Sequence, residues 1–393
     1  MSWFEGLTVF PPDPVLGLIE EFDADPRKEK LSLTVGAYRD EHLRPVIFHA
    51  TKKAEELLLA QEKDKEYLPM AGDVIFLDSI GKLAFGEKNW KEYHSHITSI
   101  QTVGGTGALR IGGEFLKPLV ANKLYISSPS WPNHRHLLQE GGYTIETYPY
   151  YDGQNHKVDF QKLIEFCETL PPNVVFLLHL SCHNPTGCDL THEQWKLLSK
   201  MMLKKRIFPF FDCAYQGLGK GLAQDTDALQ IFIQDGHEFI VAYSCSKNFS
   251  LYCERVGALF VFSRNKDLCP NILNVLKMKT RGIISTPPAH GARIVSFILN
   301  TPDLYEAWKQ ELELDVQRIL AMRHKLSLVL GKGYAFIQSG KGLFCITGLQ
   351  PNQIERLKRE WGIYMTLDGR INIAGLNEEA VDLLAYAIKK VVI

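Results

Sequence analysis

The sequence predicts an α/β protein, with a mostly parallel sheet flanked by helices in a large domain and a smaller α+β domain. Short apolar runs alternate with helical patterns through the middle of the chain, and strands separated by helices imply the right-handed crossovers of a parallel sheet. The run at residues 174–180 (VVFLLHL) is almost wholly apolar, which is typical of a strand buried on both faces.

The expected elements follow from these patterns in chain order. Strands of the large sheet are expected at residues 123–127, 174–180, 207–211, 239–244 and 258–262. Residues 191–204 predict a helix, which Thr191 and Gln194 would open with a capping box. Residues 303–330 suit a long connecting helix. The smaller section that follows should hold strands at 342–347 and 371–374, a helix at 352–361 and a final helix from Asn377.

Composition excludes several classes of protein. The 393 residues allow two domains, and 44 Lys and Arg against 45 Asp and Glu argue against a nucleic-acid binder that depends on bulk charge. No apolar run approaches the roughly 18 residues of a membrane span, and the N-terminus lacks the pattern of a secretory or transit segment. We therefore expect a cytoplasmic protein with no membrane or nucleic-acid partner. The 8 cysteines include no CxxC pair, so reduced thiols are expected and no metal site is predicted.

Residues 1–14 are apolar and rich in proline, and they include Trp3, Phe4 and Phe10. Exposed aromatic side chains in an extended arm need a surface to cover them. The arm either folds back on its own domain or lies on a partner subunit, and the residues alone favour neither.

Lys247, in the segment SCSKN at 244–248, directly follows a predicted buried strand. Loss of solvent lowers the pKa of a lysine and frees the neutral amine for Schiff-base chemistry. A lysine at a strand end that simply reaches solvent is the commoner case, so the neighbouring motifs decide.

Those motifs all suit one cofactor. Asp212 could keep a pyridine nitrogen protonated, and Tyr215 could hydrogen-bond a phenolic oxygen of the same ring. Asn184 lies in the turn-forming segment HNPTG, and Arg255 can bind a phosphate through two hydrogen bonds. The GGTG segment at 104–107 opens a helical pattern whose free N–H groups suit an anion.

Each of these motifs has a structural alternative when taken alone. The GGTG segment could be only a tight turn, and Asp212 could cap a helix. The GLGKG run at 217–221 lacks the spacing and the Ser or Thr after Lys that a nucleotide-binding P-loop requires. Together, however, the motifs describe a pyridoxal phosphate (PLP) site.

With these motifs in place, the sequence resembles the aspartate aminotransferases, PLP enzymes of fold type I and aminotransferase class I. The resemblance runs from DPVLGL at 13–18 to the C-terminal helix. The segments that carry it are SWPNH at 130–134, CHNPTG at 182–187, DCAYQG at 212–217, SCSKN at 244–248, ERVG at 254–257 and PPAHG at 287–291.

The resemblance implies a role for each residue of the PLP site. Lys247 would hold PLP covalently and later move a proton between the substrate Cα and C4′ of the cofactor. Asp212 would pair with the pyridine nitrogen, with His134 behind it, and Trp131 would stack on the ring. The phenolic oxygen would contact Asn184 and Tyr215. The phosphate would be held by Gly105, Thr106, Ser244 and Arg255, and by Tyr67 of the other subunit of a homodimer.

The substrate contacts also follow from the resemblance. Arg370 would bind the α-carboxylate with help from the Gly36 N–H, and Trp131 and Asn184 would line the substrate site. Arg281 would come from the partner chain and bind the side-chain carboxylate. The substrates would be small dicarboxylic amino acids and 2-oxo acids, because two guanidinium groups fix a molecule with two anionic ends. The implied domains are an arm at 1–12, a small domain at 13–44 and 314–393, and a large PLP-binding domain at 45–313.

Four residues depart from the family pattern. Asp368 stands where a small Ser is usual, Ile284 stands where many relatives carry Tyr, and Thr366-Leu367 is atypical. These departures leave open an aromatic or broad-specificity aminotransferase beside an aspartate aminotransferase. A non-catalytic relative that binds PLP or a partner protein is the alternative from another class. The set of Lys247, Asp212, Arg255 and Arg370 counts against it.

Overall fold

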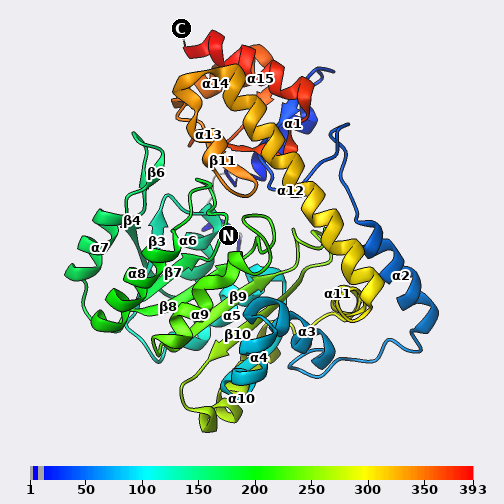
Figure 1. Cartoon of the computed structure of the whole chain (residues 1–393), viewed down its shortest axis with the longest axis vertical. Coiled ribbons are helices and arrows are strands. Elements are labelled where there is room, and N and C mark those ends of the chain that lie inside the picture. Colours follow the sequence, from blue (N-terminus) through cyan, green and yellow to red (C-terminus); the bar gives the residue numbers. More distant parts are fainter. Residues whose placement is uncertain (1–2, 8–12, 393) are drawn as a thin grey trace.

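The protein consists of a large unit around one seven-stranded sheet and a smaller unit at one end of it (Figure 1). This arrangement comes from a computed structural model that describes residues 3–7 and 13–392. It confirms the predicted fold class.

The elements have the following bounds. The helices are α1 (Gly17–Ala24), α2 (His49–Gln61), α3 (Val74–Phe85), α4 (Glu87–Tyr93), α5 (Gly104–Leu116), α6 (Pro132–Glu140), α7 (Phe160–Thr169), α8 (His192–Lys205), α9 (Asp227–Gln234), α10 (Cys269–Ile283), α11 (His290–Asn300), α12 (Pro302–Leu330), α13 (Phe336–Ser339), α14 (Pro351–Trp361) and α15 (Glu378–Val392). The strands are β1 (Leu31–Ser32), β2 (Ile97–Val103), β3 (Lys123–Ser128), β4 (Thr144–Pro149), β5 (Tyr151–Asp152), β6 (Lys157–Val158), β7 (Val175–His179), β8 (Phe208–Cys213), β9 (Phe239–Ser244), β10 (Val256–Phe262), β11 (Phe344–Ile346), β12 (Ile363–Tyr364) and β13 (Arg370–Asn372).

The large sheet has the strand order β2-β10-β9-β8-β7-β3-β4, and all pairs except those of β10 are parallel. Strand β10 follows β9 through the loop 245–255 without a crossover helix, so it returns antiparallel. The predicted mostly parallel sheet is therefore correct. The capping box of α8 is also present, because Thr191 and Gln194 exchange both side-chain to backbone hydrogen bonds.

Both faces of the sheet are buried, as the apolar run at 174–180 predicted. Val175 and Leu177 of β7 belong to a cluster that also holds Leu109 of α5. Phe176, on the opposite face of the same strand, belongs to a second cluster with Trp195 of α8. Successive side chains of a strand point to opposite faces, so β7 needs apolar residues at every position.

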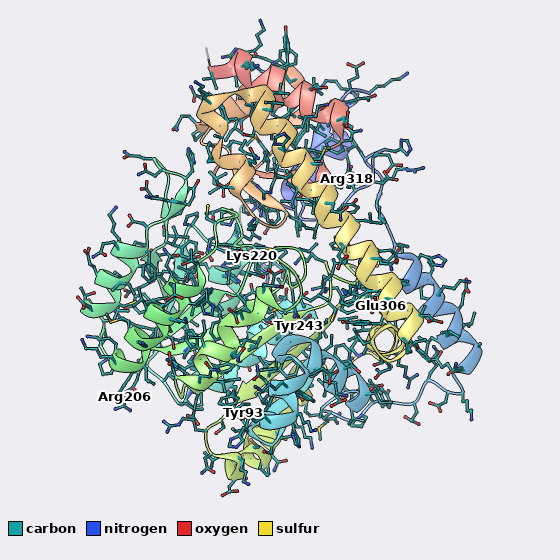
Figure 2. The ribbon with its side chains drawn as sticks, in the orientation of Figure 1. Tyr93, Arg206, Lys220, Tyr243, Glu306 and Arg318 are labelled. Carbon is teal, nitrogen blue, oxygen red and sulfur yellow. The ribbon has the colours of Figure 1, made fainter. Side chains whose placement is uncertain are left out.

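The smaller unit joins the two ends of the chain. Strand β1 pairs in parallel with β12, and β11 pairs with β13. Helix α12 runs from the large unit, where it packs on α2 and α11, to the smaller unit, where it packs on α13 and α15 (Figure 1). Glu306 and Arg318 mark these two parts of the helix (Figure 2). Because α12 passes through residue 313 without a break, the domain limits at 44 and 313 stay predictions.

The described part of the N-terminal arm is not buried by its own chain. Trp3 is 98% exposed and Phe4 is 73% exposed. Phe10 and the prolines at 11 and 12 lie outside the described residues, so a partner surface for the arm stays a prediction.

Two other expectations can be compared with the structure. Within residues 3–7 and 13–392, no helix combines the length and the apolar character that crossing a membrane requires. All 8 cysteines are free thiols, in agreement with the expected reduced state.

We expect Phe210→Ala to destabilise the fold by about 3–5 kcal/mol, because the ring is fully buried where β8 packs against α5. A Cβ built on Gly112 of α5 would lie 2.7 Å from this ring, which shows how closely the layers pack. Urea unfolding followed by circular dichroism measures the loss. Leu119→Ala, at a position 65% exposed, is the control and should change stability by less than about 0.5 kcal/mol. Equal losses in both variants would contradict this packing.

Candidate active site

The pairing register brings the predicted motifs to one edge of the sheet. His179 at the end of β7 pairs with Asp212 near the end of β8. Val256, the first residue of β10, pairs with Val103, the last residue of β2. Because β10 is antiparallel, its start lies at the same edge as the carboxyl ends of its neighbours, where ligands of α/β sheets bind. The GGTG segment, the Lys247 loop and Arg255 therefore meet there.

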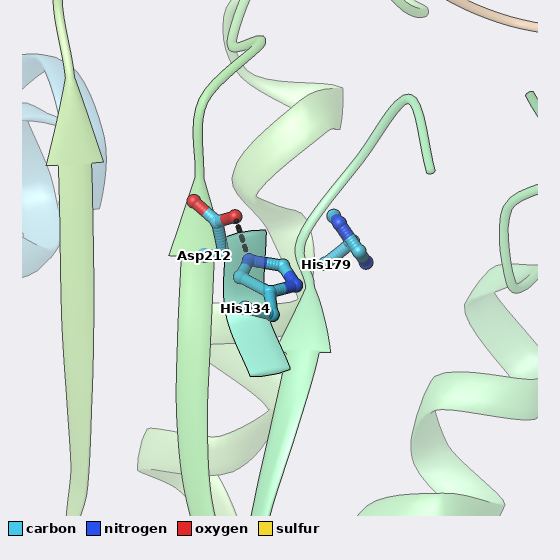
Figure 3. A group of neighbouring side chains, drawn as sticks. All are labelled: His134, His179 and Asp212. Atoms are coloured by element: carbon cyan, nitrogen blue, oxygen red, sulfur yellow. Dashed lines mark hydrogen bonds and ion pairs between the residues drawn. The ribbon is translucent and has the colours of Figure 1, made fainter. Parts of the chain in front are cut away.

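Asp212 and His134 form a buried pair at this edge (Figure 3). The His134 Nε2 atom lies 2.9 Å from the Asp212 carboxylate, and its Nδ1 atom lies 2.9 Å from the Ser130 hydroxyl. Burial alone would raise the pKa of Asp212, but the His134 hydrogen bond and the positive fields of His134 and Lys247 hold it below its ordinary value. The carboxylate is therefore ionised at neutral pH and can pair with a protonated ring nitrogen.

His179 lies beside this pair and was not among the predicted site residues. It is 7% exposed, and neither ring nitrogen has a hydrogen-bond partner in the described structure. Burial lowers the pKa of His179 to about 3, so its imidazole is neutral. His134, His179 and Asp212 each have an atom that could bind a metal ion, and these atoms lie within 4.8 Å of one another. However, His134 Nε2 and the Asp212 carboxylate are already hydrogen-bonded to each other (Figure 3). We interpret the group as a carboxylate–imidazole pair with a neutral neighbour and not as an open metal site.

Lys247 lies half-buried in the loop between β9 and β10, with its Nζ atom 4.8 Å from the centre of the Tyr215 ring. Burial lowers the pKa of Lys247 to about 8, although the nearby Asp212 carboxylate raises it; the Arg255 charge lowers it further. An appreciable fraction of the amine is therefore neutral near physiological pH and available as a nucleophile.

Asn184 links the Lys247 side of the site to Arg370. Its Nδ2 group donates to the Tyr215 hydroxyl at 3.3 Å, and its Oδ1 atom accepts from Arg370 Nη1 at 3.1 Å. Burial raises the pKa of Tyr215, so its phenol stays protonated. The Asn184 amide therefore orients both the Tyr215 hydroxyl and the Arg370 guanidinium.

The Arg370 Nε donor is free in this arrangement. Its Nη2 group donates to the Thr34 carbonyl at 2.7 Å, whereas its buried Nε group has no partner among the described residues. The guanidinium lies 4.5 Å from the centre of the Phe344 ring. A Cβ on Gly36 would fall 2.4 Å from the same ring, so only glycine fits beside it. A buried cation with a free donor suits a carboxylate ligand.

A second group, which we call the anion cradle, consists of Gly104, Gly105, Ser244, Ser246 and Arg255. A Cβ on Gly104 would lie 2.7 Å from Arg255 Nη2, and one on Gly105 would lie 3.0 Å from the Ser244 Cβ. Arg255 Nη1 donates to the Ser246 hydroxyl at 3.2 Å, and the two serine hydroxyls are 3.1 Å apart.

The anion cradle also lies at the start of α5, whose first turn holds Thr106 and supplies free N–H groups. The cradle therefore combines a guanidinium, hydroxyls and helix N–H groups, the donors that suit a phosphate. Ser246 was missed from the sequence, although its place beside Lys247 in SCSKN could have indicated it.

The remaining predicted residues divide into two groups. Trp131 precedes α6, and its ring centre lies 5.1 Å from that of His134, so it belongs to the site. Tyr67 is 81% exposed, and Arg281 is exposed in the last turn of α10, where it donates to the Ser285 hydroxyl. Among the described contacts of this single chain, neither reaches the other predicted site residues. Both were assigned to a partner subunit and stay predictions.

The departure at Asp368 has a local structural use. Its carboxylate accepts the Thr366 hydroxyl at 2.5 Å and the Arg370 backbone N–H at 3.2 Å. Asp368 therefore stabilises the turn that leads into Arg370. Leu367 in the same turn is 56% exposed, and nothing in the structure explains its identity or that of Ile284.

Comparison with known proteins places this chain in a family. The sequence pattern of the aminotransferase class I and II family matches residues 28–388. The mitochondrial aspartate aminotransferase of Gallus gallus is 39% identical, over 99% of this chain and 94% of that protein. An aromatic-amino-acid aminotransferase from Burkholderia pseudomallei, solved covalently bound to pyridoxal phosphate, superposes with a TM-score of 0.95 at 38% identity over 100% of both chains. The cytoplasmic aspartate aminotransferase of Saccharomyces cerevisiae gives 0.96 at 32% identity, over 99% of this chain and 98% of that one.

We expect chemical labelling of the Lys247 amine to rise with a midpoint near pH 8 in the cofactor-free protein, because only the neutral amine reacts. Asp212→Asn should move this midpoint to lower pH, because the carboxylate that favours the ammonium form is removed. Mass spectrometry of the Lys247 peptide across a pH series measures both. A midpoint above pH 10 in the parent, or an upward shift in the variant, would contradict the buried position of this amine.

Proposed function

The chain belongs to the aminotransferase class I and II family, and on this premise we propose that it transfers the amino group of aspartate to 2-oxoglutarate. The products are oxaloacetate and glutamate, and the reaction is reversible with two half-reactions. One observation carries the proposal. The Lys247 amine with its lowered pKa, the ionised Asp212 carboxylate and the anion cradle lie at the same edge of the sheet.

We propose PLP as the cofactor, and the residues present fit it. When bound, PLP supplies an aldehyde that a lysine amine can capture and a pyridine ring that takes up electrons. The anion cradle and Thr106 hold the phosphate, and Asp212 keeps the ring nitrogen protonated. Asn184 and Tyr215 contact the phenolic oxygen, Trp131 covers the ring, and Tyr67 of the partner subunit completes the phosphate contacts.

The chain's own residues orient the substrate and move its proton. Arg370 binds the α-carboxylate through the side of its guanidinium that carries the free Nε donor, beside the Gly36 backbone. Arg281 of the partner subunit binds the second carboxylate. Two fixed anionic ends hold the Cα–H bond in one direction, and the Lys247 amine accepts that proton at Nζ.

An aromatic or broad-specificity aminotransferase is the alternative, and the similarity to the Burkholderia pseudomallei enzyme supports it. Phe344 also places an apolar ring 4.5 Å from the Arg370 guanidinium. The relatives carry both mitochondrial and cytoplasmic names, so the cytoplasmic location stays a prediction. The proposed active site requires a homodimer, because Tyr67 and Arg281 reach it from the partner subunit.

Lys247→Ala should abolish amino transfer and leave no cofactor that borohydride can fix to the chain, since the amine is the attachment point. Lys220→Ala is the matched control, because that lysine is exposed and belongs to a different loop from Lys247. Absorbance of the reduced protein and a coupled assay measure both properties. Turnover retained in Lys247→Ala would refute the proposed function.

Arg281→Asp should reduce kcat/KM for aspartate about ten- to a hundredfold more than for phenylalanine, because it removes a charged hydrogen-bonded contact to the second carboxylate. The measurement compares both donors with one keto acid. Equal losses for the two donors would remove Arg281 from the substrate site.

A further inference from the structure

The segment at residues 33–38, which we call the clamp segment, is fastened to β13 and Arg370. The Thr34 carbonyl accepts from Arg370 Nη2 at 2.7 Å. The Asn372 side chain donates to the carbonyls of Val35 and Ala37, each at 2.7 Å. A displacement of Arg370 therefore moves the clamp segment with it, because these bonds leave its backbone little freedom.

Tyr252 touches both the clamp segment and the anion cradle. Its hydroxyl accepts a hydrogen bond from the Tyr38 backbone N–H at 3.0 Å. Its carbonyl accepts from Arg255 Nη1 at 3.1 Å, and the same Nη1 donates to Ser246. One residue of the loop between β9 and β10 therefore joins the proposed substrate clamp to the proposed phosphate site.

The Tyr38 end of this link is held in place by α12. The Arg318 guanidinium lies 5.3 Å from the centre of the Tyr38 ring, and its Nη2 group donates to the Asp40 and Leu376 carbonyls (Figure 2). The nearly buried Asp315 lies one turn earlier on the same helix. These contacts hold the Tyr38 side of the link against α12.

The Tyr252 hydroxyl stays protonated and neutral at any working pH. Burial raises the pKa of Tyr252 to about 12, and the Asp315 charge acts in the same direction. In this state its oxygen accepts the Tyr38 backbone N–H.

We infer that Tyr252 is a positioning residue that couples carboxylate binding at Arg370 to cofactor binding at Arg255. The inference rests on the proposed function. Tyr252 contacts neither ligand in this account and acts by holding the clamp segment at a fixed distance from the anion cradle. Because coupling between two sites is reciprocal, a dicarboxylate bound at the clamp tightens PLP, and PLP tightens the dicarboxylate.

Tyr252→Phe tests this coupling with PLP and succinate as probes. The rate at which PLP leaves the protein is measured with and without saturating succinate, which cannot donate an amino group. In the parent, succinate should slow the loss of PLP. In Tyr252→Phe this slowing should shrink about three- to tenfold, and the KM for aspartate should rise by a similar factor with kcat changed less than about twofold.

The matched control is Tyr143→Phe, which removes another buried hydroxyl that donates one hydrogen bond, to the Gly113 carbonyl at 2.9 Å. It should keep the parent's response to succinate. If Tyr252→Phe also keeps that response, or binds PLP more weakly with the response unchanged, the coupling role is overturned.

A second measurement needs no variant. Hydrogen exchange of the Tyr38 amide, read in a peptide that spans the clamp segment, should slow when PLP binds to the cofactor-free parent. Exchange unaffected by PLP would overturn the inference even if Tyr252→Phe fails to fold. A parent that transfers no amino group from any donor would refute the proposed function alone, because the loss of PLP and the hydrogen exchange are measured without turnover.

Discussion

The structure depends on one electrostatic constraint, which is a lysine amine kept from water within reach of an ionised carboxylate. Removing water from Lys247 favours its neutral form, whereas the Asp212 charge favours the ammonium form. The balance leaves the amine with a pKa of about 8, near enough to neutrality to act as a nucleophile and then as a base. Asp212 can remain ionised although buried because His134 donates to it and the Lys247 charge acts in the same direction.

The fold satisfies this constraint through the direction of one strand. The parallel strands β7 and β8 deliver His179 and Asp212 to their carboxyl ends. The antiparallel strand β10 starts at that same edge and places Arg255 beside the GGTG turn. A parallel β10 would put its first residue at the opposite edge, about 20 Å away for a strand of this length. The Arg255 guanidinium, which would bind a phosphate, and the Lys247 amine, which would bind an aldehyde, lie in the same loop between β9 and β10. They stay at one edge of the sheet because this loop holds no crossover helix.

Local sequence patterns predicted much of this, and long-range contacts explain what they missed. The apolar run at 174–180 and the Thr191 capping box depend on neighbours in sequence, and both were predicted correctly. His179 was missed because a polar residue at a strand end has no distinctive signal until the register shows what it faces. Ser246 was missed although it lies beside Lys247, because its contact with Arg255 is visible only in the fold. The Tyr38–Tyr252 hydrogen bond joins residues more than two hundred positions apart, which no local pattern encodes. The roles of Tyr67 and Arg281 depend on a second chain.

The central claim is that the Asp212 carboxylate keeps the ring nitrogen of bound PLP protonated at neutral pH. Nitrogen-15 NMR of the protein loaded with ring-labelled PLP measures this directly. We expect the shift of a protonated pyridine in the parent near pH 7.5 and of an unprotonated pyridine in Asp212→Asn. An unprotonated ring nitrogen in the parent, or a shift that does not respond to the loss of the carboxylate, would contradict the account.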